Sequence, residues 1–240
     1  MQAASPLVPA MPGVARKLRD ALEIQSAELD RPGRRPGPAW LLNPRRLEIV
    51  LAAAAYPGLH LRSASRLLLS PLPTLRYHVK ILEAHRLLAA RRRGSRVHLF
   101  LPSMFPEPVE RFLEAWQDPE GRRVLAVLRE GAPRGVAELA DATRIPLPSV
   151  RRLASRLAEQ GAIRGVGARG ESLYQLSPAW RAFERLCLTE TLERLERFLA
   201  ILRADDLHPV VESQDGDRAR IVVDGRRFRI RFVLPLNPLG

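Results

Sequence analysis

The chain has 240 residues, of which 46% are apolar and 5% aromatic, and its 39 Lys and Arg against 26 Asp and Glu give a net charge of +13. This length and composition fit one or two compact domains. The single cysteine, Cys187, excludes an intramolecular disulfide and a four-thiolate metal site. No stretch approaches the roughly 18 uncharged apolar residues of a membrane span, and the N-terminus lacks a secretory signal pattern, so we expect a cytoplasmic protein.

The positive charge is concentrated in one segment. Residues 43–102 hold 11 basic and 2 acidic residues (11 − 2 = +9), whereas residues 1–42, 103–180 and 181–240 carry +2, +1 and +1. A focused positive field attracts a polyanion, and nucleic acid is the usual one. The alternative is a basic face that is merely solvated.

The N-terminal segment combines a helical pattern with a linker. Apolar residues recur at helical spacing over Val14–Leu29, which predicts a helix. Residues 31–38, RPGRRPGP, are typical of a linker because proline and glycine interrupt regular structure.

Residues 43–102 predict three helices followed by a hairpin. Asn43 and Pro44 open the first helix, and Ser70 with Pro71 caps the third. The expected elements are a helix from Asn43-Pro44 to Tyr56, an extended step over Leu59–Leu61, helices over Arg62–Leu68 and Pro71–Leu87, and strands over Leu88–Arg93 and Arg96–Leu101. In the second strand we expect His98 and Phe100 on the polar side. This is the element order of a winged helix-turn-helix domain.

The same order recurs downstream as a weak internal repeat. The pentapeptide Leu72-Pro73-Thr74-Leu75-Arg76 matches Leu147-Pro148-Ser149-Val150-Arg151 at an offset of 75, and residues 94–102 match 170–178 at an offset of 76. The second copy is expected to comprise helices over Gly121–Arg129, Ala137–Thr143 and Pro148–Gln160 and a hairpin over Ile163–Leu176, with Glu107–Trp116 as a connecting helix.

Beyond Pro178 we expect one long amphipathic helix and a small antiparallel β-meander. The apolar face of the helix, Ala179–Leu202, could pack within the chain or against a second copy, and we favour a homodimer. The expected strands are Val210–Glu212, Arg218–Val223 and Arg226–Leu234, because Asp215-Gly216 and Asp224-Gly225 are typical hairpin turns.

The third helix and the hairpin of the first copy supply the candidate nucleic-acid contacts. Leu75, Val79 and Leu82 form a stripe that must face the core, so the opposite face points outward, and helix-turn-helix proteins lay this helix in the major groove. Hairpin arginines would meet phosphates, as would the start of the second helix. The expected DNA-contacting residues are Arg62, Thr74, Arg76, Tyr77, Lys80, Arg91, Arg92, Arg93 and Arg96.

The third helix of the second copy leaves another polar face outward. Its candidate DNA contacts are Ser149, Arg151, Arg152, Ser155 and Arg156. Because its hairpin is poorer in charge and its segment is nearly neutral, a protein-binding or dimerising role is equally open.

The sequence contains no motif typical of an enzyme. A glycine-rich phosphate loop, a nucleophile elbow and a His-Glu-x-x-His run are all missing. His78 and His85 share one side of a helix, but two imidazoles alone do not hold a metal, so packing is the simpler role. We therefore expect no catalysis, no cofactor and no metal; the sequence names no effector.

Several of these motifs together resemble a known family. Pro57-Gly58, Thr74–Val79 leading to Leu82-Glu83, Leu87-Leu88 and the arginine-rich wing resemble archaeal winged helix-turn-helix transcription regulators of the ArsR/MarR-like superfamily, several of which carry two winged domains in tandem. The resemblance covers residues 43–102 well and 119–178 loosely. It implies binding of operator DNA by the third helix and wing, usually as a dimer. Arg86 departs from the pattern, since the family commonly has glycine there, and the cysteine ligands of metal-sensing members are missing.

We therefore expect a mainly α (α+β) protein with two tandem winged helix-turn-helix domains. It would bind double-stranded DNA sequence-specifically as a nucleoid-associated transcription regulator. The alternative is a winged-helix scaffold for protein partners with only non-specific affinity for nucleic acid. The expected divisions are an N-terminal helix and linker (1–42), the first winged domain (43–102), a connecting helix (103–118), the second winged domain (119–178), a long helix (179–204) and the meander (205–240).

Overall fold

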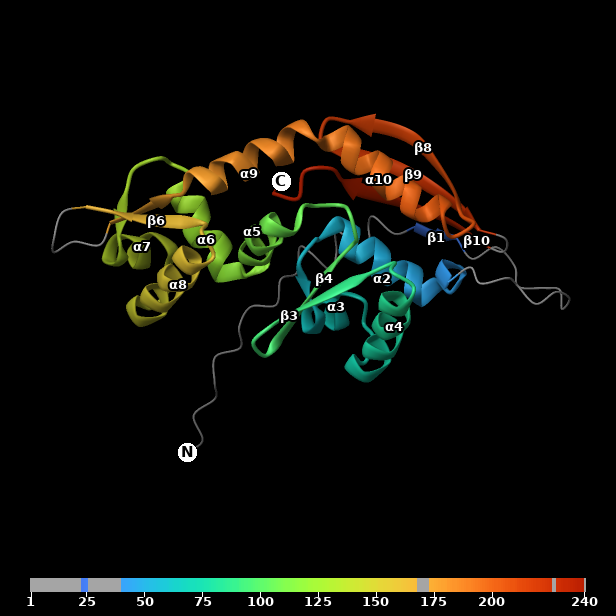
Figure 1. The fold of residues 1–240 in the computed structure, drawn as a ribbon, viewed down its shortest axis with the longest axis horizontal. Coiled ribbons are helices and arrows are strands. Elements are labelled where there is room, and N and C mark those ends of the chain that lie inside the picture. The colour runs from blue at the N-terminus through green and yellow to red at the C-terminus, as the bar shows by residue number, and fades with distance from the viewer. Residues whose placement is uncertain (1–22, 26–39, 168–172, 226–227, 240) are drawn as a thin grey trace, which may run out of the picture.

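The computed structural model describes residues 23–25, 40–167, 173–225 and 228–239. It shows a mixed α/β protein with small antiparallel sheets. Two helical units lie below a layer of helices and strands formed by the C-terminal part of the chain (Figure 1). In this described part, no helix is both long and apolar enough to cross a membrane.

The first helical unit has the expected order of elements. It comprises η1 (Trp40–Leu42), α2 (Pro44–Ala55), β2 (Leu59–His60), α3 (Leu61–Leu67), α4 (Leu72–Ala84), β3 (Ala89–Arg93) and β4 (Arg96–Phe100), with the sheet order β2-β4-β3. The side chain of Asn43 caps α2 by accepting from the N–H groups of Arg45 and Arg46, which confirms this predicted helix start.

The second unit repeats this order after a connecting helix. It comprises α5 (Glu107–Gln117), α6 (Pro119–Leu128), β5 (Arg134–Gly135), α7 (Val136–Thr143), α8 (Leu147–Glu159), β6 (Ile163–Val166) and β7 (Leu173–Leu176), with the sheet order β5-β7-β6. The likeness extends to the backbone. Left-handed residues Leu69 (φ 48°) and Arg86 (φ 56°) have counterparts 75 residues later in Arg144 (φ 55°) and Gly161 (φ 76°).

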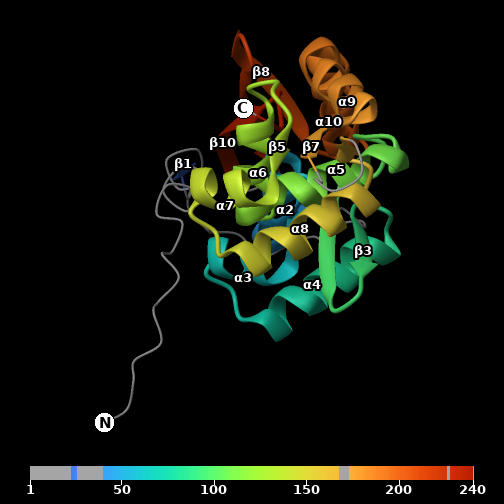
Figure 2. The same ribbon diagram turned by 90° about the vertical axis from the view of Figure 1, so that its left-hand side faces the viewer.

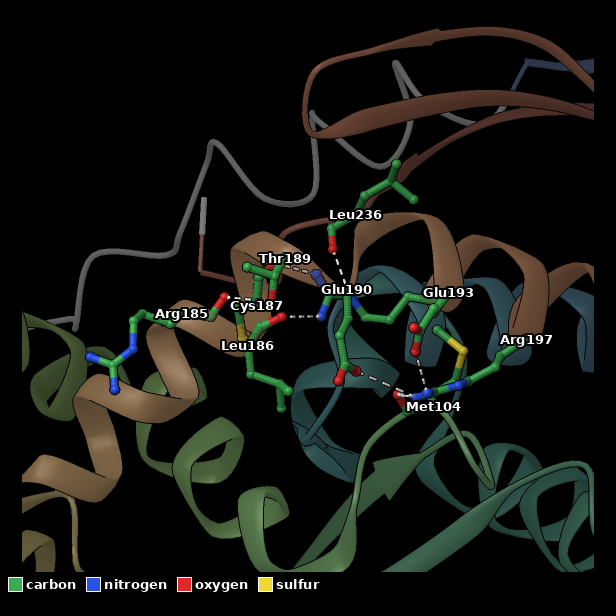
Figure 3. Close-up of polar contacts among 10 residues, drawn as sticks. Met104, Arg185, Leu186, Cys187, Thr189, Glu190, Glu193, Arg197 and Leu236 are labelled. Carbon is green, nitrogen blue, oxygen red and sulfur yellow. Dashed lines mark hydrogen bonds and ion pairs between the residues drawn. The ribbon is translucent and has the colours of Figure 1, made fainter.

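The expected long helix over residues 179–202 is wrong. The chain forms two helices, α9 (Pro178–Thr189) and α10 (Thr191–Arg203), which are broken at Glu190. The buried guanidinium of Arg194 donates to the carbonyls of Leu186 (3.2 Å), Cys187 and, from the C-terminal segment, Leu236 (2.8 Å) (Figure 3). A helix end leaves carbonyls unpaired, and this side chain satisfies them, which stabilises the break.

The C-terminal strands complete the core of the first unit. β8 (His208–Asp215), β9 (Arg218–Gly225) and β10 (Phe228–Pro235) join β1 (Glu23–Gln25) in a sheet of order β1-β10-β9-β8. Phe232 and Leu234 on β10 share one buried cluster with Leu75 and Val79 on α4 and with Phe198 on α10. Leu195, Phe198, Leu199 and Leu202, which form most of the expected apolar face on α10, therefore pack within the chain, whereas Leu188 and Leu192 remain exposed.

Residues 23–25 correct the expected N-terminal helix. They form a strand that pairs antiparallel with β10, with Ile24 opposite Ile230. The unpaired backbone groups at the edge of a sheet favour an added strand, and this tertiary contact overrides the helical spacing. The rest of the expected helix and the linker at 31–38 lie outside the described residues.

The third helix of the first unit is shorter than expected at both ends. Pro71, and not Ser70, is its N-cap residue, while the Ser70 carbonyl accepts from the hydroxyl of Ser65 (2.6 Å). The helix ends at Ala84 instead of residue 87, because the left-handed backbone of Arg86 turns the chain toward β3.

Strand β4 is buried on both faces, contrary to the expected polar side. His98 is 6% exposed and Phe100 is 2% exposed. Leu99 faces the core of the first unit, whereas Phe100 belongs to the second buried cluster together with Leu113. The two cores thus meet at β4. The alternation of apolar and polar residues in the sequence does not show that both faces of this strand are buried.

Candidate nucleic-acid interface

Helix α4 presents an exposed face of four predicted contact residues. Thr74, Arg76, Tyr77 and Lys80 are all exposed, and Tyr77 keeps 62% of its surface. Within the described residues, Arg76 and Lys80 form no ion pair. Cations without an internal counter-ion are available to phosphates and base edges, so this face suits nucleic acid.

At the start of α3, the backbone N–H of Arg62 is not free to bind a phosphate, contrary to the expectation. Its side chain is exposed, but its backbone N–H is already bound by Nδ1 of His60 (3.3 Å), which caps the helix. The rings of His60 and His98, which the sequence pattern does not connect, lie 5.6 Å apart. Burial, and then the nearby His98, lowers the pKa of His60 to about 4, so the cap is neutral at neutral pH.

Three of the four hairpin arginines are bound to carboxylates from α5 and the residue after it. The three pairs are Arg91 with Glu110 (3.0 Å), Arg93 with Glu114 (3.5 Å) and Arg96 with Asp118 (3.3 Å). These carboxylates recur every four residues, so they form one row, here called the α5 carboxylate row. Within the described chain, Arg92 has no carboxylate partner, and its Nε donates to the Gly94 carbonyl (3.3 Å).

Two members of the α5 carboxylate row are buried. Glu110 and Glu114 are each 5% exposed. Burial raises the pKa of Glu114, and the neighbouring Arg93 opposes this rise. The side-chain hydrogen bond from Arg91 to Glu110 raises the pKa of Arg91. A phosphate would therefore have to replace a carboxylate before it could bind Arg91, Arg93 or Arg96.

The polar face of α8 divides into exposed and engaged residues. Arg151 and Arg152 are exposed, and Nη2 of Arg152 donates to the half-buried Ser149 (3.4 Å). The hydroxyl of Ser155 donates to the Arg151 carbonyl (3.2 Å). Arg156 is half-buried and donates to a carboxylate (2.5 Å). Among the candidate contacts on α8, within the described structure, Arg151 and Arg152 therefore remain as the readily available cations.

Asp118 connects the two units, and the sequence prediction missed it. Its carboxylate accepts from Arg96 of the hairpin and from Arg156 of α8, and it also caps α6 through the N–H of Glu120 (3.1 Å). The Asp118-Pro119 pair is a sequence signal for a helix start. Its role as an ion-pair partner depends on the tertiary fold.

The candidate surfaces lie on one side of the molecule. α4, the β3–β4 hairpin and α8 occupy the lower half of Figure 1, opposite β8 and β9, and the view turned by 90° agrees (Figure 2). Among the described residues, no group of three or more His, Cys, Asp and Glu could hold a metal ion. Cys187 is buried, and burial raises its pKa to about 12.

Comparison with known proteins identifies one domain type. Residues 121–167 match the model of the IclR helix-turn-helix domain. The second unit is similar to an IclR helix-turn-helix domain. The match spans 47 residues (167 − 121 + 1) of 240, so it characterises this unit and not the whole chain. It falls on the unit in which the sequence resemblance was looser.

The other comparisons add no argument about function. No curated protein matches the chain. An ArsR family transcriptional regulator is 28% identical over 38% of this chain and 94% of its own, with a TM-score of 0.33. ScpB from Mycobacterium tuberculosis is 20% identical over 67% and 98%, with a TM-score of 0.23. IdeR from T. acidophilum is 13% identical over 86% and 96%, with a TM-score of 0.21. At these TM-scores, the likenesses are too weak to transfer a fold or a role.

Proposed function

We propose that the protein binds double-stranded DNA sequence-specifically and regulates transcription, with both units acting as tandem winged helix-turn-helix domains. The observation that carries this proposal is the exposed face of α4, within the segment of charge +9, where Arg76 and Lys80 have no counter-ion among the described residues. The helix-turn-helix match of the second unit supports the same class of function.

The first unit supplies the base contacts in this proposal. With α4 in the major groove, Arg76 would bind a guanine edge, Thr74 a base or phosphate, and Tyr77 and Lys80 the backbone. Arg92 is the hairpin cation best placed for a phosphate, because the other three are paired with carboxylates. Its contact would position the protein on the duplex without reading sequence.

The second unit contributes Arg151 and Arg152 of α8 to the same side of the molecule (Figure 1). A single chain would then place two third helices toward one duplex. Leu195, Phe198, Leu199 and Leu202 of α10 are covered within the chain, whereas Leu188 and Leu192 stay 64% and 61% exposed. The proposed complex therefore keeps a homodimer, with these two leucines as its candidate contact.

Selection of bound sequences from a random duplex pool at about 150 mM salt tests the proposal. We expect an enriched motif that binds at least about 10³-fold tighter than scrambled duplex. Arg76→Ala should cost about 1–3 kcal/mol on that motif and relax its preference at one position. Arg92→Ala should weaken all sequences alike and flatten the salt dependence.

Arg181→Ala is the matched control, because Arg181 is an exposed arginine on α9, away from the proposed interface. It should leave the affinity for the motif unchanged. Uniformly weak binding of all duplexes, with a Kd on the order of 10⁻⁴ to 10⁻⁶ M and no enriched motif, would favour the scaffold function instead.

A further inference from the structure

A pocket of about 280 Å³ lies where the β3–β4 hairpin, α5 and α8 meet. Its charged lining consists of three arginines and two carboxylates, together with a histidine ring, so its net charge is close to +1. The polar residues used below are Arg96, Arg156, Glu114, Asp118 and Gln160. The volume suits a small metabolite better than a polymer.

Two acceptor oxygens that line this pocket have no hydrogen-bond donor in the described structure, although the guanidinium of Arg93 also lines it. Oε1 of Glu114 and Oε1 of Gln160 are both buried, and neither accepts a hydrogen bond from any residue that the structure describes. The ion-pair partner of Glu114, Nε of Arg93, is 3.5 Å away, which is too long for a strong hydrogen bond. Burying an acceptor without a donor is unfavourable. Two such oxygens in one pocket favour a ligand that carries N–H donors.

Two other lining residues have an excess of donors. Arg96 and Arg156 share the single carboxylate of Asp118, each through one terminal nitrogen. A guanidinium has five N–H groups, so both side chains retain unused donors and their charge is only partly balanced. These two arginines favour an anionic group.

We propose that this pocket binds a small zwitterion of the α-amino acid class. The carboxylate of the ligand would lie against Arg96 and Arg156, and its ammonium group would donate to Glu114 and Gln160. A simple anion would leave the buried oxygens of Glu114 and Gln160 without a donor and would lie near the negative charge of Glu114. A simple cation would be repelled by Arg96 and Arg156. A ligand that carries both charges satisfies both pairs of residues.

Occupancy of the pocket would also affect the proposed DNA interface, and this consequence rests on the proposed function. Arg96 lies on the same hairpin as Arg92, and Arg156 lies on the same helix as Arg151 and Arg152. The ligand would thus act as an effector at the junction of the two units, where it changes how the hairpin and α8 present these three cations to DNA.

Binding is tested without DNA, so that its failure is distinguishable from failure of the proposed function. The full chain is titrated calorimetrically with each proteinogenic amino acid up to about 10 mM, and with acetate, methylamine and inorganic phosphate as partial probes. We expect at least one amino acid to bind and the three partial probes to bind at least about tenfold more weakly.

Three substitutions localise the site. Glu114→Gln, Gln160→Leu and Arg156→Gln should each weaken binding of that amino acid by about tenfold or more, since each removes a charged or hydrogen-bonding partner. Arg152→Gln is the matched control, because Arg152 lies on α8 but does not line the pocket, and it should leave the affinity within about twofold. The Gln160 side chain makes no hydrogen bond through Oε1, so Gln160→Leu tests the site even where an ion-pair variant fails to fold.

Two results would overturn the proposal. The first is the failure of every amino acid to bind at about 10 mM. The second is binding of acetate or phosphate as tight as that of any amino acid and unchanged in Glu114→Gln, which would show a plain anion site.

Discussion

Arg86 adopts a left-handed backbone conformation that the resembled family commonly assigns to glycine. The N–H of Arg86 donates to Glu83 and that of Leu87 to Leu82, which is the Schellman pattern at a helix end. The second unit forms the same pattern after α8 with Gly161 at the left-handed position. The departure at Arg86 therefore leaves the turn geometry unchanged and puts a residue with a Cβ in a left-handed backbone conformation, which is strained.

Exchanging these two residues should change stability in opposite directions. Arg86→Gly should raise the free energy of unfolding by about 0.5–1 kcal/mol, because glycine avoids the left-handed strain but loses more backbone entropy. Gly161→Arg should lower it by a similar amount, since a Cβ there would make only an ordinary van der Waals contact with Phe112 at 4.0 Å and the left-handed strain is what opposes the substitution. Urea unfolding of both variants measures the difference. A lower stability of Arg86→Gly would show that the arginine side chain itself holds this turn.

His60 should make the protein less stable in mild acid. Its pKa is about 4 in the folded chain and near 6.5 when unfolded, so the unfolded state binds a proton that the folded state does not. Its contribution to stability is complete above pH 6.5 and is lost as the pH falls toward 4. After allowance for solvent screening, we expect a loss of about 1 kcal/mol over this range.

His60→Asn separates the proton from the helix cap. Asparagine can still accept from the N–H of Arg62 but does not titrate, so the variant should lose less stability than the natural chain between about pH 7 and pH 4.5. Part of the slope should remain, because burial also lowers the pKa of His98. Identical pH profiles of urea unfolding for the two proteins would contradict the assignment to His60.

At the scale of elements, local signals in the sequence predicted most of the helices and both hairpins. Asn43-Pro44 marks the start of α2, and the repeated pentapeptides mark α4 and α8. The break at Glu190 was missed because no proline or glycine marks it in the sequence. It depends on Arg194, which donates to the carbonyls of Leu186 and Cys187 in the preceding helix and of Leu236 near the C-terminus. Strand β1 was missed because its partner, β10, is about 200 residues away in sequence.

The α5 carboxylate row was likewise hidden, although its spacing of four is visible in the sequence. A row of carboxylates on a helix is usually a solvated face, and only the fold shows that it faces the hairpin arginines. The candidate DNA contacts could therefore be named from the sequence, but the sequence could not show which of them are already bound to carboxylates. In the structure Arg91, Arg93 and Arg96 are bound in this way, whereas Arg92 donates to a backbone carbonyl.

Neutralising one member of the row should strengthen DNA binding. Glu110→Gln frees Arg91 from its ion pair, so the affinity for duplex DNA should rise about twofold to tenfold and the salt slope should steepen by about one phosphate contact. Glu120→Gln, an exposed residue of α6 that removes the same charge, is the control and should change the affinity less. Equal effects of the two variants would mean that net charge alone, and not release of Arg91, sets the affinity.

At the scale of the whole molecule, the two units meet in buried packing at one strand and one turn, in addition to the ion pairs of Asp118. Phe100 lies on β4 of the first unit but packs in the core of the second. Gly58 (φ 82°) allows the turn after α2 to approach α5, and a Cβ there would lie 3.1 Å from the backbone of Leu113. Such continuous packing predicts that both units unfold together, because neither core is complete without the shared contacts.

Phe100→Ala should both destabilise the protein and uncouple its units. The lost burial and the remaining cavity should cost about 3–5 kcal/mol, and calorimetric unfolding should change from one transition to two. Leu101→Ala is the comparison, because Leu101 is buried in the first cluster alone. It should lower the stability by about 2–5 kcal/mol without creating separate transitions. If Phe100→Ala still unfolds in a single transition, the coupling passes through other contacts, and the ion pairs of Asp118 with Arg96 and Arg156 become the next candidates.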